Sequence, residues 1–511
     1  MKHDTLWWRD GIIYQIYPRS FADSNYDGIG DLPSITSKLD YLQDLGIDAI
    51  WLSPIFPSPD VDFGYDLADY TAIDPKFGTM EDFDKLLEEA HNRDIHVILD
   101  LVLNHISDQH PLFIESKISK DNPFHDWYMW HDPKPNGDPP NNWQAIFGGS
   151  GWEYDPDLDQ YYYHMFYKEQ PDLNWRNPDV RQALLNVFRF WLDKYVDGFR
   201  LDVFNMYFKD EALRENPPKI VLRSFDRQMH IYDNSQPEMF PLLREIQEIL
   251  DQYPQSYAVG ETFLADPQQT AAYCCEDKLH AAFNFDFAEN RLHPKRFLDS
   301  ATNWYLALPE DAWPNNFSSN HDCPRTATHY CFGEDDCRAK VAMAMLLTLK
   351  GTPFMYYGEE IGLRDIPIRM KSDVKDPTGK TFWPLYKGRD GCRAPMQWHS
   401  DINAGFSQAE PWLPVHANYP HRNVAQQLSN PQSLLNFVKK LIQIPRAEPT
   451  PQLGDFKPLI EEPHRLLNGF MQEKKYLFYS TSAVGTWNSK HHQAIGCPSS
   501  IEKIPSRRLF P

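Results

Sequence analysis

The sequence predicts an α/β protein built as a (β/α)8 TIM barrel, with a domain inserted after the third strand and a short, truncated or atypical C-terminal β domain. Short apolar runs alternate with amphipathic helical stretches over most of the chain, which is typical of parallel strands joined by helices. Polar residues follow several of the expected strands, at the end where such barrels carry catalytic groups. A chain of 511 residues is long enough for a barrel and smaller domains.

The first part of the barrel is expected over residues 1–104. Residues 12–17, 47–52 and 96–103 are predicted strands. The last of them is almost wholly apolar, as expected of a strand that is covered on both faces. Residues 34–45 and 80–93 are predicted helices, the first with Ser34 as its N-cap.

A polar, aromatic segment then interrupts the alternation at residues 105–176. It contains a turn-rich run at 135–140 and three consecutive tyrosines at 161–163. Because a structureless loop of this length is unusual in a compact domain, we expect an inserted domain here.

Residues 177–446 are predicted to complete the barrel. The expected helices are 179–195, 240–252, 335–350 and 433–444, and the expected strands are 198–203, 256–260, 282–287, 316–319 and 353–357. A long loop follows the last of these strands, over residues 358–430. The final segment, 447–511, begins as a β domain with a predicted strand at 475–479, but residues 487–511 show no clear period.

Composition argues against several classes of partner. The formal net charge is −22 and the isoelectric point is near 5.3, whereas nucleic acids and anionic membranes attract basic surfaces. No apolar run approaches the length of about 18 residues that a membrane span needs, and the N-terminus lacks the apolar core of a signal peptide. We therefore expect a cytoplasmic protein whose seven cysteines are reduced.

Arg200 and Asp202 carry the central chemical hypothesis. Two positions apart on a strand, their side chains share one face, and the guanidinium favours an ionised carboxylate suited to nucleophilic attack. Glu261, after another apolar strand, is a candidate proton donor, since glycoside hydrolysis requires a second carboxyl of raised pKa. Taken singly, these residues also fit a buried ion pair and an exposed acid at a strand end. His321 and Asp322 follow a further strand, and this combination favours a catalytic site.

Four segments in this order resemble the α-amylase superfamily, glycoside hydrolase family 13, and its exo-acting α-glucosidase and oligo-1,6-glucosidase branch. The segments are Asp100-Leu101-Val102-Leu103-Asn104-His105, Gly198-Phe199-Arg200-Leu201-Asp202, Val259-Gly260-Glu261-Thr262 and Phe317-Ser318-Ser319-Asn320-His321-Asp322. Gln170-Pro171-Asp172-Leu173-Asn174 resembles a mark of the oligo-1,6-glucosidase group. The resemblance extends over residues 5–450.

The resemblance implies a retaining mechanism. Asp202 would be the nucleophile and Glu261 the general acid/base, while Asp322 would hold sugar hydroxyls and help distort the ring. Arg200, His105 and His321 would line the same subsite as hydrogen-bond donors. Retaining enzymes place their two carboxyls roughly 5–5.5 Å apart.

Exo action requires a blind pocket for one terminal glucose. The resemblance places Tyr65 there as a stacking residue, with Asp66 and Arg393 as a charged pair that grips the non-reducing end, and adds two aromatic residues of the insertion, Phe147 and Phe166, to the substrate-binding set. Val203 follows the nucleophile, where valine resembles α-1,6-specific relatives. Residues 208–218 resemble α-glucosidases that also transfer glucose.

A calcium site is expected in residues 23–31. Oxygen-bearing side chains alternate there, and Gly28 occupies the turn, as in the first nine positions of an EF-hand loop. Ser34 stands where an EF-hand requires Glu, so the loop is not a true EF-hand; an acidic turn without metal is the alternative. By resemblance to related α-glucosidases the ligands of a structural Ca²⁺ would be Asp23, Asn25, Asp27, Ile29 (through its carbonyl) and Asp31. No organic cofactor is expected.

Three functions remain open at this point. The first is a retaining α-glucosidase acting on a small oligosaccharide. The second is a glucosyl-transferring or isomerising relative, such as a transglucosidase, a sucrose isomerase or a trehalose synthase. The third is a non-catalytic binding relative, which the presence of all three carboxyls disfavours. A monomer or a homodimer is expected.

Overall fold

The computed structural model describes residues 6–221, 225–262, 264, 266–275 and 277–447. Eight parallel strands form one sheet in the order β10-β11-β1-β2-β3-β7-β8-β9. Since the order of the strands follows the chain around the sheet, with β9 and β10 as its two edges, the sheet is a nearly closed barrel. The strands are β1 (Ile13–Ile16), β2 (Ala49–Leu52), β3 (His96–Leu101), β7 (Gly198–Leu201), β8 (Tyr257–Gly260), β9 (Ala281–Ala282), β10 (Asn315–Phe317) and β11 (Thr352–Tyr356). The predicted (β/α)8 barrel is confirmed.

The strand register brings the carboxyl ends of β3, β7 and β8 to one level. Leu101 pairs with Leu201, and Leu201 pairs with Gly260. The ladder continues past the strands, since the N–H of Asp202 donates to Leu101 and that of Glu261 to Leu201. Residues that follow these strands therefore lie at the same mouth of the barrel.

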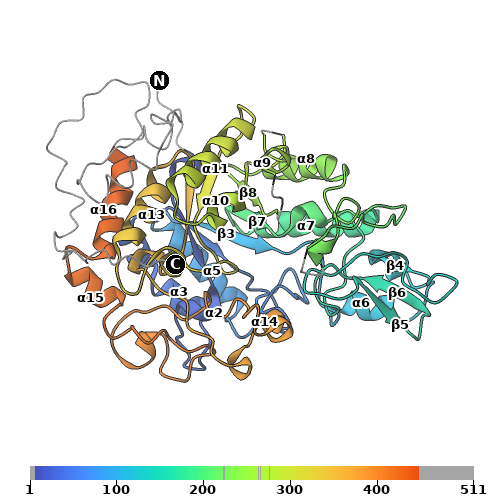
Figure 1. Ribbon diagram of the computed structural model, residues 1–511, viewed down its shortest axis with the longest axis horizontal. Helices are drawn as coiled ribbons and strands as arrows, with labels where there is room; N and C mark the ends of the chain where they lie inside the picture. Colours follow the sequence, from blue (N-terminus) through green and yellow to red (C-terminus); the bar gives the residue numbers. More distant parts are fainter. Residues whose placement is uncertain (1–5, 222–224, 263, 265, 276, 448–511) are drawn as a thin grey trace, which may run out of the picture.

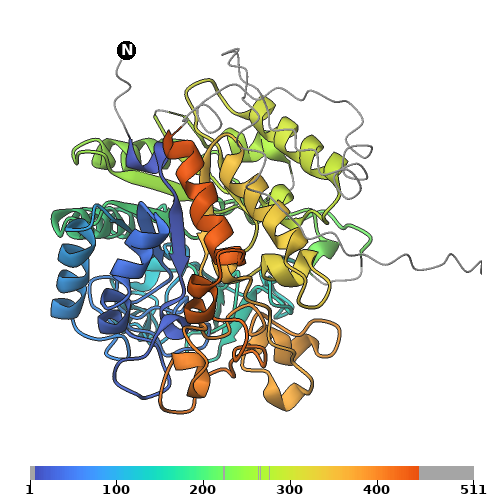
Figure 2. The same cartoon turned by 90° about the vertical axis from the view of Figure 1, so that its left-hand side faces the viewer.

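Helices surround the strands, and their ends follow local sequence signals. Thr79 and Asp82 form a capping box at α5, and Asn177 caps α7, which begins with Pro178. The last helix, α16, packs against α13 (Figure 2). The larger helices are α4 (Leu39–Leu45), α5 (Met80–His91), α7 (Pro178–Asp193), α8 (Met239–Leu250), α11 (Pro294–Ala307), α13 (Cys337–Thr348) and α16 (Leu434–Ala447).

Shorter helices lie in the segments that connect the strands and the larger helices. They are α1 (Trp7–Asp10), α2 (Pro18–Phe21), α3 (Leu32–Thr36), α6 (Pro111–Ser116), α9 (Pro267–Ala271), α10 (Phe285–Glu289), α12 (Thr326–Tyr330), α14 (Pro377–Phe382) and α15 (Val424–Ser429). Single 3-10 turns are η1 (His125–Trp127), η2 (Phe204–Met206), η3 (Phe225–Arg227), η4 (Glu359–Ile361), η5 (Lys371–Asp373) and η6 (Ile402–Gly405).

A small antiparallel sheet lies to one side of the barrel (Figure 1). It has the order β4-β6-β5 and is formed by β4 (Trp130–His131), β5 (Trp152–Asp155) and β6 (Gln160–Tyr163), within the segment expected as an insertion. Aromatic rings pack around it: Trp152 and Trp143 each contact Tyr163. These rings give the small sheet an apolar cluster apart from the interior of the barrel.

Two element predictions are wrong. The helix expected at 34–45 is two helices, α3 and α4, and Asp31 rather than Ser34 caps the first: its carboxylate accepts the N–H of Ser34 at 2.7 Å. Of the strand expected at 282–287, only Ala282 lies in a strand, as the second residue of β9, which pairs with β8; the chain then continues into α10. The predicted strand at 475–479 and the C-terminal β domain lie outside the described residues.

Within the described part of the chain, no disulfide joins the cysteines, which are Cys274, Cys275, Cys323, Cys331, Cys337 and Cys392. None of the helices in the described ranges combines the length and the hydropathy that a membrane span requires.

Candidate active site

The candidate active site is centred on Arg200, on β7. Its side chain is fully buried, and Nη1 donates to Asp100 Oδ1 at 2.6 Å and to Asp202 Oδ1 at 2.7 Å. The other terminal nitrogen, Nη2, forms an ion pair with Glu261. One guanidinium thus holds three carboxyls from the ends of three adjacent strands, and Asp202 and Glu261 lie side by side on it.

Burial raises the pKa of both Asp202 and Glu261. For Asp202 the pKa rises to about 7, because desolvation and the neighbouring Asp100 and Asp322 outweigh the lowering effect of Arg200. For Glu261 it rises to about 8, with desolvation again the largest cause and Arg200 opposing it. The expectation that Arg200 alone keeps Asp202 ionised is therefore incomplete. The pair of Asp202 and Glu261 therefore retains a proton near neutral pH. Glu261 binds this proton more tightly than Asp202, because its pKa is the higher of the two.

A chain of hydrogen bonds connects Gln15, on β1, and His321, which follows β10, to this cluster. Gln15 donates its amide N–H to His321 Nδ1 at 2.8 Å, which leaves the ring proton on Nε2, 2.5 Å from the phenolic oxygen of Tyr65. That hydroxyl donates to Asp100 at 3.0 Å, and the rings of Tyr65 and His321 are stacked. Burial lowers the pKa of His321 to about 3, so the imidazole is neutral.

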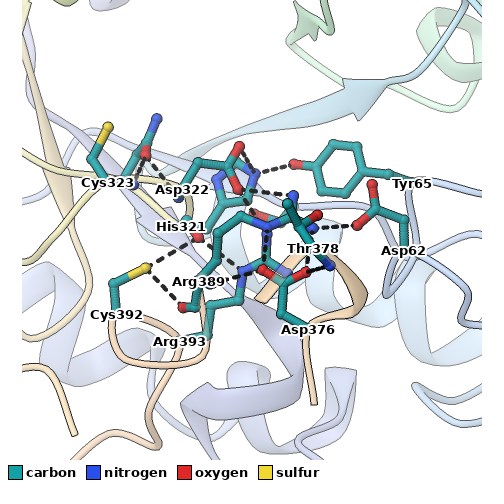
Figure 3. A network of polar contacts seen from close by, with 12 residues as sticks. Asp62, Tyr65, His321, Asp322, Cys323, Asp376, Thr378, Arg389, Cys392 and Arg393 are labelled. Atoms are coloured by element: carbon teal, nitrogen blue, oxygen red, sulfur yellow. Dashed lines mark hydrogen bonds and ion pairs between the residues drawn. The ribbon is translucent and has the colours of Figure 1, made fainter. Parts of the chain in front are cut away.

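Asp322 is held by two arginines from the long loop after β11 (Figure 3). Arg393 Nη2 lies 2.7 Å from Asp322 Oδ1, and Arg389 Nη1 lies 3.4 Å from the same oxygen. Burial would raise the pKa of Asp322, but His321 and the two guanidinium groups outweigh it and hold the pKa well below its usual range. Asp322 is an ionised carboxylate next to a carboxyl pair of raised pKa, and about a quarter of its side chain is exposed, at 24%.

The expected pair of Asp66 and Arg393 does not form. Asp66 instead accepts the N–H groups of Val61 and Asp62, because it closes the turn that precedes Tyr65. The charged pair is formed by Asp62 and Arg389, with Asp62 Oδ1 2.5 Å from Nη2 (Figure 3). Asp376 completes it, since its Oδ2 accepts from Arg389 Nε at 2.9 Å.

The insertion supplies one side of the site. His105 Nε2 lies 3.0 Å from the carbonyl oxygen of Tyr65, and its ring is 4.8 Å from that of Phe166. Phe166 is 5.6 Å from Phe147, whose ring lies 5.4 Å from the guanidinium carbon of Arg389. The structure thus brings His105, Phe147 and Phe166 together with the residues around Asp322.

Val203, directly after Asp202, is buried and adopts a left-handed backbone conformation with φ of 35°. A β-branched residue is disfavoured in this region, so the turn is strained at the end of β7. Its side chain belongs to the apolar cluster that also contains Trp143 and Phe166 of the insertion.

The loop at residues 23–31 contains the expected oxygen donors, and their chemistry fits Ca²⁺. Asp23 and Asp31 are buried, and their carboxylates accept loop N–H groups, including those of Gly28 and Ser24 respectively. Asn25 and Asp27 are exposed and hydrogen-bond to each other. Within the described residues, no group of three or more His, Cys, Asp or Glu side chains converges as a metal site.

Comparisons with known proteins agree with this geometry. A family model described as "Alpha amylase, catalytic domain" matches residues 15–452. The chain belongs to the α-amylase family.

Proteins that are similar in sequence to this chain are named as glucosidases. A "Probable alpha-glucosidase" from Rhizobium meliloti is 44% identical over 504 residues, covering 94% of this chain and 90% of the relative. An "Oligo-1,6-glucosidase" from Parageobacillus thermoglucosidasius is 40% identical over 541 residues, covering 99% and 92%. Together with the family model, these names indicate that the α-amylase-family chain is a glycoside hydrolase.

Solved structures of the α-amylase family include similar transfer enzymes. The α-glucosyl transfer enzyme XgtA superposes with a TM-score of 0.87 at 42% identity, covering 90% of this chain and 88% of that one. The trehalulose synthase MutB from Pseudomonas mesoacidophila superposes with a TM-score of 0.81 at 35% identity, covering 89% and 87%.

Sequence reasoning missed Asp62, Arg389, Asp376 and Gln15. Arg389 lies in the same loop segment as Arg393, with only three residues between them, so the sequence did show two candidate arginines. Nothing in the sequence indicated which of them pairs with an acid of the Gly64-Tyr65 turn. That choice depends on how the long loop folds back over the barrel.

Proposed function

We propose that this α-amylase-family enzyme is a retaining, exo-acting α-glucosidase that releases glucose from the non-reducing end of short α-glucosides, isomalto- or malto-oligosaccharides or sucrose. The observation that carries the proposal is the pair of buried carboxyls, Asp202 and Glu261, held side by side on Arg200. Two adjacent carboxyls of different proton affinity are what a retaining mechanism requires.

In the proposed reaction Asp202 attacks the anomeric carbon while Glu261 donates its proton to the leaving oxygen. The bond to the leaving group breaks, and a glucosyl ester of Asp202 remains. Glu261, now a carboxylate, takes a proton from water, which attacks the anomeric carbon and displaces the Asp202 carboxylate, so that glucose is released with its original configuration. Asp322, ionised by its two arginines, would stabilise the positive charge that develops on the sugar ring.

The blind end of the pocket is assigned to Asp62 and Arg389 rather than to Asp66 and Arg393. Asp62 is almost fully buried and contacts a guanidinium that also reaches Asp322. A terminal glucose would satisfy these charged groups with hydroxyls, whereas a longer chain would leave them buried and unpaired.

A glucosyl-transferring or isomerising activity is the second candidate. Its support is the similarity to solved structures titled as an α-glucosyl transfer enzyme and a trehalulose synthase. The same glucosyl ester serves both reactions, and only the acceptor differs: water or another sugar hydroxyl.

Chromatography of the products from maltose, isomaltose, sucrose and trehalose tests the proposal. Free glucose as the main product supports hydrolysis. Trisaccharides or an isomeric disaccharide as the main product support the second candidate. No conversion of any of the four sugars would contradict both.

Replacing Val203 by Thr or Ala is expected to raise the rate of maltose hydrolysis relative to isomaltose. Val203 directly follows the proposed nucleophile and would bound the aglycone side, where a contact of one methyl group discriminates by about 1–3 kcal/mol. The ratio of kcat/KM for the two disaccharides measures it. Val203→Ile, which keeps an apolar β-branched side chain, is the control. An unchanged ratio in the Thr and Ala variants removes Val203 as the cause.

We also propose a structural Ca²⁺ bound by Asp23, Asn25, Asp27, Asp31 and the carbonyl of Ile29. Three carboxylates within nine residues support it. A ligand that binds only the native state stabilises it by RT ln(1 + [L]/Kd), so the stabilisation grows with the concentration of free ion. Chelation is therefore expected to lower the Tm, and added Ca²⁺ to restore it. Asp27→Asn should reduce this response, and a Tm that EDTA does not change would contradict the site.

For its cellular setting we propose the cytoplasm, where free thiols stay reduced, and a monomer or a homodimer in solution.

A further inference from the structure

Gln15 is a polar side chain in the interior of the barrel. It lies on β1, two positions after Ile13, so the two side chains point to the same face of the strand. Ile13 belongs to an apolar cluster whose other members come mostly from the barrel strands, and Gln15 is only 1% exposed. Because burying an amide costs free energy unless its polar groups have partners, the partners of Gln15 indicate what it contributes there.

The amide nitrogen of Gln15 has two acceptors. Gln15 Nε2 lies 3.1 Å from Ser53 Oγ and 2.8 Å from His321 Nδ1. An amide nitrogen donates and does not accept, so His321 Nδ1 is the acceptor and carries no proton. Since burial lowers the pKa of His321 to about 3, the ring is neutral, and its single proton lies on Nε2.

The proton on Nε2 determines the direction of the hydrogen bonds that follow (Figure 3). The Nε2–H of His321 faces the hydroxyl oxygen of Tyr65 at 2.5 Å and Asp322 Oδ2 at 3.4 Å. The Tyr65 hydroxyl accepts from His321 and donates its own proton to Asp100 Oδ2 at 3.0 Å. Every proton in this chain therefore has a defined place.

The opposite tautomer would reverse the chain. An unprotonated Nε2 would accept the proton of the Tyr65 hydroxyl, which could then no longer donate to Asp100. It would also turn a lone pair, instead of an N–H, toward the carboxylate of Asp322. Asp100 shares the guanidinium of Arg200 with Asp202, so the change would reach the carboxyl cluster.

The charged groups around His321 keep its ring neutral. Asp322 favours protonation of the ring. Desolvation opposes protonation most strongly, and the guanidinium groups of Arg200, Arg389 and Arg393 oppose it as well. The tautomer of the neutral ring then depends on the hydrogen bond at Nδ1.

We propose that Gln15 is a positioning residue of the catalytic site, which holds the His321 proton on Nε2 and so directs the hydroxyl of Tyr65 toward Asp100. Gln15 acts through His321, and Ser53 binds the second hydrogen of the same amide. The effect on the reaction rests on the proposed function, whereas the tautomer can be measured without it.

Replacing Gln15 by Met tests the inference, because Met has a similar length and cannot donate. Selective ¹⁵N labelling of histidine distinguishes a protonated ring nitrogen from an unprotonated one, and His321→Gln identifies the signals of this ring. In the wild type we expect the proton on Nε2. In Gln15→Met the Nδ1 tautomer should appear. The kcat for p-nitrophenyl α-glucoside and for maltose should then fall about fivefold to tenfold, as for the loss of one hydrogen bond, with a smaller change in KM.

Two further variants separate the roles of the neighbours. Ser53→Ala is the matched control, since it removes the other partner of the same amide and keeps the bond to His321. It should leave both the tautomer and kcat unchanged. Tyr65→Phe removes the acceptor of the Nε2–H; it should lower kcat but leave the tautomer unchanged, because Gln15 still donates to Nδ1.

A proton on Nδ1 in the wild type, or an unchanged tautomer in Gln15→Met, would overturn the inference. A tautomer that changes in Tyr65→Phe would overturn it too, even if Gln15→Met did not fold. An unchanged kcat in Gln15→Met, or an equal loss of kcat in Ser53→Ala without a change of tautomer, would assign Gln15 a structural role alone and also overturn it. A wild-type enzyme that cleaves none of the substrates would instead contradict the proposed function, and the inference would then stand or fall on the tautomer.

Discussion

Asp202→Asn is expected to lower the kcat for α-glucoside cleavage by about 10⁴-fold or more, because an amide cannot form the glucosyl ester. Asn keeps an oxygen for the hydrogen bond from Arg200, so the barrel should stay folded. Glu261→Gln is expected to cost about 10²–10⁴-fold on a disaccharide, the usual contribution of a general acid. Initial rates of glucose release measure both, with circular dichroism to verify the fold.

The two variants should differ in a way that identifies their roles. A p-nitrophenolate leaves without a proton, so Glu261→Gln should be impaired less at the first step with the nitrophenyl glucoside than with a disaccharide. Azide added to Asp202→Asn should give the inverted β-glucosyl azide, whereas azide added to Glu261→Gln should give the α-product. Undiminished glucose release in either variant would remove the mechanism.

The positions of the main carboxyls could be predicted because they depend on local pattern and on the strand register. The apolar strands β7 and β8 are each followed directly by an acidic residue. A parallel barrel brings the carboxyl ends of its strands to one level, as the pairing of Leu101 with Leu201 and of Leu201 with Gly260 shows. No knowledge of the loops was needed to place Asp202 and Glu261 together.

The charged pair of Asp62 and Arg389 could not be predicted in the same way. Its members are 327 residues apart, and the second lies in a long loop without a hydrophobic period. The same limit explains the pKa of Asp202. Adjacency to Arg200 indicates an ionised carboxylate, but the burial of the cluster and the approach of Asp100 and Asp322 appear only when the barrel closes.

The prediction of a single helix at 34–45 was wrong for a local reason. Ser34 is a good capping residue by type, but Asp31 lies three positions earlier, is buried, and accepts the N–H of Ser34 itself. The earlier residue therefore caps the helix, and the turn between Thr36 and Leu39 divides the segment into α3 and α4.

Arg200→Met is expected to lower the free energy of unfolding by about 3–5 kcal/mol, because it leaves buried carboxyls without their counter-charge. Asp100, Asp202 and Glu261 all contact this guanidinium and are nearly inaccessible to water. In the wild type, burial already raises the folded pKa values of all three, to about 6, 7 and 8, and removing the lowering effect of Arg200 raises them further. Thermal unfolding measures the loss of stability.

The loss should depend on pH, with a sign that follows from the direction of these shifts. An acid whose folded pKa exceeds its unfolded value binds more protons when folded, so stability falls as the pH rises from the unfolded pKa through the folded one. The destabilisation of Arg200→Met should therefore be larger at pH 8 than at pH 5, where the folded protein can keep the carboxyls protonated. Arg93→Met, which removes the surface ion pairs with Asp40 and Glu89, is the control and should cost at most about 1 kcal/mol.

A second substitution separates charge from packing at Arg200. Adding Asp100→Asn to Arg200→Met removes one of the uncompensated acids, so the double variant should regain stability at pH 8 and little at pH 5. It should not regain activity, since Asp202 and Glu261 still lack the guanidinium that holds them side by side. The contrary outcome is that Arg200→Met loses the same stability at both pH values and that Asp100→Asn restores none of it. In that case the positive charge of Arg200 does not offset the desolvation of the buried carboxyls, and Arg200 stabilises the fold through its volume alone.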